Sequence, residues 1–183
     1  MKWSLSELHR YSREPLHIDS TFDLKAPLMA RFPETILDAT GVRVKGDVTY
    51  HNGDATMVIS VKTTLTVPST RSLTAVELPL DFNFVENYTA DPDHRALYDD
   101  HELVFVLDND QSMIDFDKAL VENIYEQIPT KVLSATEEAG HAFPAGKGWQ
   151  VIDEQSHSEQ KNQSVDPRLA KLKQLFPDQD DHN

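Results

Sequence analysis

Two stretches of the sequence carry residue types that could hold a phosphate or a divalent cation, and their spacing decides whether they do. Gly140–Gly148 contains three glycines and a lysine, as do loops that cradle nucleotide phosphates. Five residues separate its first two glycines where the motif has four, and Gly148 stands where Ser or Thr would bind magnesium. Asp108–Ser112 begins like a calcium loop, but Met113 replaces the required glycine and Ala119 the required glutamate. Neither stretch is therefore predicted to bind its ligand.

The remaining polar clusters give little support to metal or nucleophile chemistry. Asp99–Glu102 has metal-ligating residue types but no defined spacing, so a solvated charge run is the more ordinary interpretation. The histidines are scattered, and none has the i, i+4 partner of a helical zinc pair. The chain has no cysteine and no G-x-S-x-G elbow, which excludes disulfides, thiolate zinc sites and a cysteine nucleophile. The sequence favours a binding protein over an enzyme, without cofactor or metal.

The composition indicates a globular protein with a polar extension and narrows its partners. The 183 residues include 31 acidic and 17 basic side chains, for a net charge of −14. The resulting negative field repels phosphate backbones, which disfavours nucleic-acid binding through a broad basic surface. A basic protein partner, or contact through a local basic patch, is compatible with this charge. No apolar run approaches the roughly 18 residues of a membrane span, and the N-terminus lacks a signal-peptide core. We expect a cytoplasmic protein.

The N-terminal part is predicted to alternate short helices with a strand. Ser4 and Glu7 have the spacing of a capping box, which starts a short helix over Leu5–Tyr11. Apolar residues at even positions across Leu16–Leu24 indicate a strand. Lys25–Phe32 is predicted as another short helix.

The centre of the chain is predicted to be an antiparallel meander built around the hairpin Leu65–Leu80. A strand with Val42 to Val48 on one face is followed by Asn52-Gly53, a strong hairpin signal. Ala55–Val67 returns as the second strand, and Leu73–Val85 is the third. Arg71 lies near the tip between the last two strands, where an exposed arginine is ordinary.

The following stretch is predicted to contain one loop, one strand and the main helix. Glu86–Glu102 is acidic and poor in apolar residues, so we expect a mobile loop. Leu103–Leu107 is a compact apolar strand. Lys118–Ile128 has apolar residues at helical spacing, and Asp115 or Asp117 can cap this helix.

The C-terminal part changes character. Residues 1–152 are predicted to be one α+β domain, and 153–164 a disordered polar linker because they contain no apolar residue. Asp and Pro start a short amphipathic helix at 165–176, and 177–183 form an acidic tail. A helix this short is marginal alone, so its apolar stripe must dock on its own domain or on a partner, and both alternatives stay open.

The fold class that follows is α+β. The sheet is mainly antiparallel, as a meander or a partly open barrel. One packed helix follows the last main strand, and a short helix lies near the C-terminus.

Four segments in this order resemble the YceD family of bacterial large ribosomal RNA subunit accumulation proteins, most closely its versions in low-GC Gram-positive bacteria. They are MKWSLSEL, PSTRSLTAVELPLDF, IDFDKALVENIYEQIP and VDPRLAKLKQLF. The resemblance covers nearly the whole chain except the acidic loop and the linker. Its most specific part is a D-P-R-x-x-x-L-x-x-L ending, which begins here at Asp166.

The sequence departs from this family at its cysteines. Many relatives carry C-x-R-C at the central hairpin, where this chain has Ser69, Thr70, Arg71 and Ser72. The second cysteine cluster of the family, after the long helix, is also missing from roughly 134–149. If those cysteines hold zinc in relatives, this chain folds its hairpin without the metal. Because only the arginine is kept, the resemblance makes Arg71 a candidate functional residue.

The resemblance implies a non-catalytic factor that supports accumulation of large-subunit ribosomal RNA and ribosome assembly. Its expected partner is a ribosome-assembly protein or a basic ribosomal protein, with local contact to ribosomal RNA left open. An interaction adaptor outside ribosome biology and, less favoured, an RNA-processing enzyme are the alternatives. The candidate partner-binding residues are Arg71, Asp166, Pro167, Arg168, Leu169, Lys171, Leu172, Lys173, Leu175 and Phe176.

Overall fold

The computed structural model describes residues 1–139 and 145–151 of the chain. The chain divides into two units, Met1–Ser134 and Ala135–Asn183. The first unit contains the sheet and the helices that pack on it. The predicted linker, C-terminal helix and acidic tail lie outside the described residues. No helix within the described part of the chain is long and apolar enough to cross a membrane.

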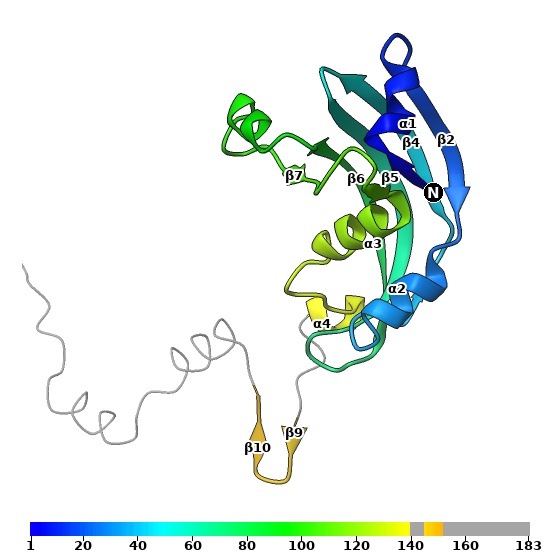
Figure 1. Ribbon diagram of the computed structural model, residues 1–183. Coiled ribbons are helices and arrows are strands. Elements are labelled where there is room, and N and C mark those ends of the chain that lie inside the picture. Colours follow the sequence, from blue (N-terminus) through cyan, green and yellow to red (C-terminus); the bar gives the residue numbers. More distant parts are fainter. Residues whose placement is uncertain (140–144, 152–183) are drawn as a thin grey trace, which may run out of the picture. The chain divides into compact units, whose positions relative to one another are not determined.

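A curved, open sheet forms the first unit, and Figure 1 shows it from one side. Its strand order is β2-β4-β5-β6-β7, with β3 paired to β5. All pairs are antiparallel except β6 with β7. The predicted α+β class with a mainly antiparallel sheet is therefore confirmed. The strands are β2 (Leu16–Phe22), β3 (Asp38–Ala39), β4 (Val42–His51), β5 (Asp54–Pro68), β6 (Ala75–Thr89) and β7 (Val104–Val106).

The alternation seen in the sequence determines which face of the central strands is buried. On β4 the valines at 42, 44 and 48 are fully buried, and on β5 every second residue from Ala55 to Val67 is buried. Gly46 permits β4 and β5 to approach closely, because a Cβ there would lie 2.1 Å from the Val58 carbonyl oxygen. The Asn52-Gly53 hairpin turn is confirmed, with positive φ at both residues.

The predicted mobile loop at Glu86–Glu102 is wrong over much of its length. β6 continues to Thr89, and its residues from Glu86 onward are buried. A 3₁₀ helix, η2 (Pro92–Leu97), follows, and the chain then returns as β7 beside Asn87–Thr89. The acidic composition and the lack of apolar residues predicted a loop, but Glu86 and Asn87 are buried with specific hydrogen bonds. The meander is therefore consecutive from β4 to β6, and β7 joins it in parallel.

Helix α3 (Phe116–Glu126) lies against the concave face of the sheet, where Figure 1 places it beside β5 and β6. Its fully buried side chains include Phe116, Leu120 and Ile124. Asp115 caps it by accepting from the Lys118 amide at 3.2 Å. The helix therefore starts two residues earlier than predicted and follows β8 (Met113–Asp115), which pairs with β1 (Lys2–Ser4).

The short N-terminal elements match their predictions. Ser4 and Glu7 form the capping box of α1 (Leu5–Leu8), with reciprocal hydrogen bonds of 3.2 and 2.9 Å. The 3₁₀ helix η1 (His9–Tyr11) continues it.

Helix α2 (Lys25–Arg31) is also close to its predicted range. Its C-terminal neighbour Phe32 stacks on Tyr125 of α3 with ring centroids 3.8 Å apart. This stacking links α2 to the helix that covers the sheet.

The described part of the second unit is small. It comprises α4 (Ala135–Glu138) and a two-stranded hairpin of β9 (Ala145–Gly146) and β10 (Trp149–Gln150). The stretch around Trp149 was predicted as a brief strand or an anchor, and it forms a strand.

Candidate functional site

The hairpin tip Ser69–Thr74, which joins β5 to β6, is closed by hydrogen bonds around one buried serine. The Ser69 hydroxyl oxygen accepts from the amides of Arg71 at 3.1 Å and Ser72 at 3.3 Å. The Ser69 amide donates to the Thr74 carbonyl at 2.7 Å. Ser69 is completely buried, so these bonds are shielded from water. The tip thus holds its shape where the YceD resemblance implies cysteines.

Thr70 anchors this tip to the chain beyond α3. Its amide and its hydroxyl both donate to the carbonyl oxygen of Val132, at 2.8 and 2.9 Å. Val132 lies just before the region that, by the same resemblance, carries the second cysteine cluster. Within the described residues, no group of three or more His, Cys, Asp or Glu is arranged to hold a metal. The hairpin tip and the segment after α3 are connected here by the two hydrogen bonds from Thr70 to Val132.

Arg71 is half-buried and does not project as a fully solvated side chain. Leu73, two residues on, is 75% exposed and has a positive φ of 62°. A cavity of about 470 Å³ lies beside the tip, lined on one side by Val67, Pro68 and Leu73 and on the other by residues after α3. The other predicted site residues, from Asp166 to Phe176, lie outside the described residues. The structure thus places only Arg71 of the predicted set.

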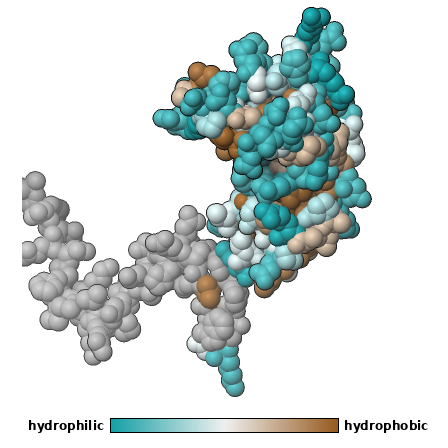
Figure 2. Space-filling view, viewed as in Figure 1, coloured by the Kyte–Doolittle hydropathy of each residue, from teal (hydrophilic) through white to brown (hydrophobic). Residues whose placement is uncertain are grey.

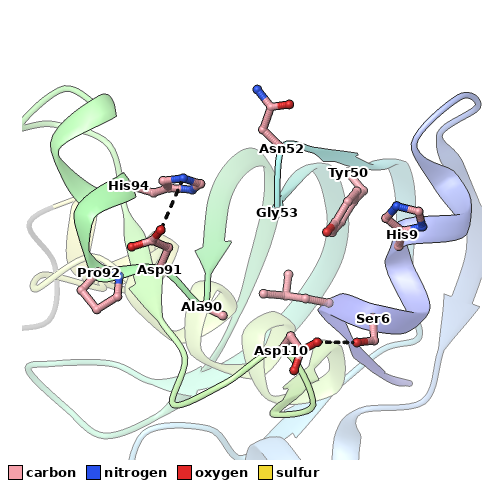
Figure 3. A pocket seen from close by; sticks show the side chains of 11 residues that line it. Ser6, His9, Tyr50, Asn52, Gly53, Ala90, Asp91, Pro92, His94 and Asp110 are labelled. Atoms are coloured by element: carbon pink, nitrogen blue, oxygen red, sulfur yellow. Dashed lines mark hydrogen bonds and ion pairs between the residues drawn. The ribbon is translucent and has the colours of Figure 1, made fainter.

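A second cavity, of about 720 Å³, lies at the opposite end of the sheet and is drawn in Figure 3. Residues of α1 and η1, of the turn between β4 and β5, and of the segment leading into η2 line it. The rings of His9 and Tyr50 meet edge to face, with centroids 5.3 Å apart. Ser6 donates to Asp110 across its lower edge at 2.9 Å. The sequence offered no signal for this cavity, because its walls come from four separate segments.

His94 connects η2 to the start of β5 beside this cavity. Its Nδ1 lies 2.8 Å from Asp54 Oδ1, and its Nε2 lies 3.7 Å from Asp91 Oδ2. The hydroxyl of Tyr98 donates to the other oxygen of Asp54 at 2.9 Å. Asp54 and His94 are both largely buried, at 11% and 27% side-chain exposure. We call Asp54, Asp91, His94 and Tyr98 the histidine clamp.

The histidine clamp shifts the pKa values of its members. Hydrogen bonding to Asp54 raises the pKa of His94. Burial opposes ionisation of Asp54, but hydrogen bonds from His94, Thr89 and Tyr98 outweigh it and lower the pKa of this carboxyl. Burial and the neighbouring Asp54 raise the pKa of Tyr98 to about 12.

These shifts favour a clamp over a catalytic base. A general base needs a free imidazole nitrogen within reach of the proton that it removes. Here both nitrogens of His94 face carboxylates, an arrangement that stabilises the protonated ring. The geometry holds η2 in place.

A buried acidic network at the C-terminal end of β6 was missed by the sequence interpretation. Glu86 is 4% exposed and accepts from the Asn123 side-chain amide of α3 at 2.6 Å and from the Tyr88 hydroxyl. Burial, followed by the hydrogen bond to Glu86 and then by its charge, raises the pKa of Tyr88. The alternation along β6 could have revealed it. Glu86 and Tyr88 continue the even-numbered positions of Phe82 and Phe84, which face the interior.

Comparison with known proteins defines the class to which this fold and these segments belong. The sequence pattern of the family described as Large ribosomal RNA subunit accumulation protein YceD matches residues 57–176. The chain therefore belongs to the YceD family. It is 30% identical over 186 residues to the uncharacterized protein YlbN of Bacillus subtilis (strain 168), and the match covers 99% of both chains. No solved structure matches it significantly. The resemblance stated from the four sequence segments is confirmed.

Proposed function

We propose that this protein is a non-catalytic factor that supports accumulation of large-subunit ribosomal RNA by binding a basic protein of the assembling large subunit. The observation that carries this proposal is membership of a family named for that accumulation. The alternative of an RNA-processing enzyme lacks comparable support, since the imidazole of His94 is engaged by two carboxylates.

The charge of the molecule favours a protein partner over direct RNA binding. The chain carries a net charge of −14, which attracts the lysine- and arginine-rich surfaces typical of proteins that bind nucleic acid. Phosphate groups are repelled by the same field. Binding through this field accelerates association and falls with salt concentration. An acidic partner would keep a basic protein away from RNA until assembly.

The function is tested in a strain that lacks the gene and carries either the full chain or a chain ending at Ser164. The ratio of large-subunit to small-subunit ribosomal RNA is measured, together with ribosome profiles. We expect the full chain to restore the ratio and the truncated chain to fail, although the truncated protein still unfolds cooperatively. A normal ratio in the strain without the gene contradicts the function. A normal ratio with the truncated chain contradicts only the role of residues 165–183.

Arg71 provides a second test of the same function. Arg71→Ala is expected to lower the free energy of unfolding by about 1 kcal/mol or less, because the side chain is only half-buried. Partner binding and the ribosomal RNA ratio should fall much further than this small change explains. Arg13→Ala, which removes an exposed arginine elsewhere, is the matched control. If both variants change partner binding and the ribosomal RNA ratio equally, Arg71 is not part of the binding surface.

A further inference from the structure

A cavity of about 290 Å³ lies between the C-terminal end of β6, the edge strand β7 and helix α3. We call it the β7 pocket. Glu86 and Tyr88 contribute to its lining from β6, Phe105 and Val106 from β7, and Met113 from β8. It is separate from the hairpin tip and from the cavity beside the histidine clamp. Its walls combine a buried carboxylate with an apolar mouth.

The carboxylate of Glu86 is buried with neutral partners. It is 4% exposed, and its two oxygens accept from the amide of Asn123 and the hydroxyl of Tyr88. Within the described residues, Glu86 forms no ion pair with Lys, Arg or His. A carboxylate taken out of water without a cation is costly, because neutral donors replace only part of its hydration. Each oxygen retains a lone pair, so the group can accept further hydrogen bonds from a ligand.

The mouth of the pocket is apolar and exposed. Val106 and Met113 are 47% and 52% exposed, and Phe105 stacks on Tyr88 with ring centroids 5.1 Å apart. Figure 2 shows hydrophobic surface where Figure 1 places β7. A long cationic side chain matches this combination. Its methylene stem can lie along apolar side chains and an aromatic ring while its charged end reaches a carboxylate.

We propose, resting on the function proposed above, that the β7 pocket binds a Lys or Arg side chain from a basic segment of the protein partner. Glu86 receives the charge, and Phe105, Val106 and Met113 cover the stem and the neighbouring apolar residues. Asp115 and Glu122 also line the pocket, but Lys2 and Arg31 pair with them at 2.9 and 2.8 Å, so Glu86 is the acidic lining residue without a paired cation among the described residues. The unpaired carboxylate of Glu86, together with the net charge of −14, disfavours RNA phosphates as the ligand. Loss of the Glu86 charge should weaken such an interaction about tenfold or more.

The test is a titration of the full chain with a short labelled peptide of alternating Lys and Val, in physiological salt. The same peptide with Glu in place of Lys is not expected to bind. Glu86→Gln keeps the shape and hydrogen-bonding capacity of the side chain but removes its charge, and should weaken binding about tenfold or more. Glu77→Gln is the matched control, since it removes an equal charge from an exposed position on the same strand. That control should change affinity less than about twofold.

A second variant keeps the proposal testable if Glu86→Gln does not fold. Val106→Lys places a positive charge at an exposed position of the mouth and should weaken binding comparably without disturbing the core. Equal weakening by Glu86→Gln and Glu77→Gln would mean unspecific attraction to an acidic surface and would overturn the proposal. Absence of saturable binding, or binding of a single-stranded RNA oligonucleotide that Glu86→Gln abolishes, would do the same.

The ribosomal RNA ratio in cells separates this site from the proposed function. Failure of the peptide titration, together with a reduced ratio in the strain without the gene, overturns the pocket and leaves the function standing. Peptide binding that depends on Glu86, with a normal ratio in that strain, supports the pocket and overturns the function.

Discussion

The two ends of the β5–β6 pair each contain buried polar groups, and different kinds of hydrogen bond satisfy them. At the hairpin tip, Ser69 and its neighbours satisfy buried polar groups with neutral hydrogen bonds. At the other end, Glu86 brings a carboxylate into the interior and relies on Asn123 and Tyr88 from α3 and β6. Around Ser69 the first end is closed by residues adjacent in sequence, and Thr70 adds a link to the Val132 carbonyl. The second is completed by a helix 37 residues away.

This difference indicates which end is organised for stability and which carries a cost for another reason. Neutral hydrogen bonds inside a turn are satisfied locally and stabilise the turn wherever it is placed. A buried carboxylate is a liability unless its partners are in place, and in some proteins such groups are retained because they contribute to specificity.

Asn123→Ala is expected to have the largest effect, because it leaves one oxygen of the buried Glu86 without its donor. We expect a loss of about 3 kcal/mol in the free energy of unfolding, measured by urea denaturation. In a Glu86→Gln background the same change should cost clearly less, since no charge is then left unsatisfied. Glu126→Ala, an exposed change near the end of the same helix, is the control and should stay within about 0.5 kcal/mol. If Asn123→Ala lowers the free energy of unfolding equally in both backgrounds, the charge of Glu86 is not the cause of the loss.

Ser69→Ala tests the other end of the pair. It removes the acceptor of two amides and should lower the free energy of unfolding by about 1 to 2 kcal/mol. Ser72→Ala, at an exposed position of the same tip, should cost about 0.5 kcal/mol or less because water replaces its bonds. If the two serines cost the same, the buried hydroxyl does not hold the tip.

The smallest effect is a pH dependence confined to the end that carries charge. The pKa of His94 is raised, so its contribution is complete below the ordinary histidine value of about 6.5 and is lost as pH rises through the higher folded value. The pKa of Asp54 is lowered, so its contribution is lost only as pH falls through that lowered value. Hydrogen exchange of the η2 amides, corrected for intrinsic rates, should therefore become faster as the solution turns alkaline.

A matched pair of substitutions tests whether His94 causes this pH dependence. His94→Gln should abolish it, and His101→Gln, at an exposed position, should leave it intact. The hairpin tip contains no group that titrates in this range and should show no such change. A pH dependence of equal size at the tip would point to a global effect and remove the contrast between the ends.

The sequence predicts most of the fold where local patterns and tertiary structure agree. The capping box at Ser4, the Asn52-Gly53 turn and the alternation of β4 and β5 are decided by neighbouring residues and are confirmed. The start of α3 was misplaced by two residues because Phe116 also belongs to its buried face. Such boundary shifts are expected where apolar residues continue past the cap.

The stretch after Val85 was misjudged because its meaning depends on distant residues. Glu86 is an unfavourable strand residue on its own, and only Asn123 and Tyr88 make its burial tolerable. The histidine clamp likewise joins Asp54 to residues 40 positions later. The local pattern assigned Glu86, and Asp91, His94 and Tyr98 of the clamp, to a charged loop. Of the candidate site, the position of Arg71 at a turn was predictable, whereas the β7 pocket and the cavity beside the histidine clamp were not.

The long border of β6 has a consequence for behaviour at high concentration. β7 covers only Asn87–Thr89, and no other described strand pairs with the outer side of β6 before that point. A border of this length that no described strand pairs with invites intermolecular strand addition, the first step toward fibrous assemblies. Pro79 lacks an amide hydrogen, and Glu77 and Asp81 flank it with like charges. Prolines and charged side chains at such an edge are features that disfavour strand addition between copies.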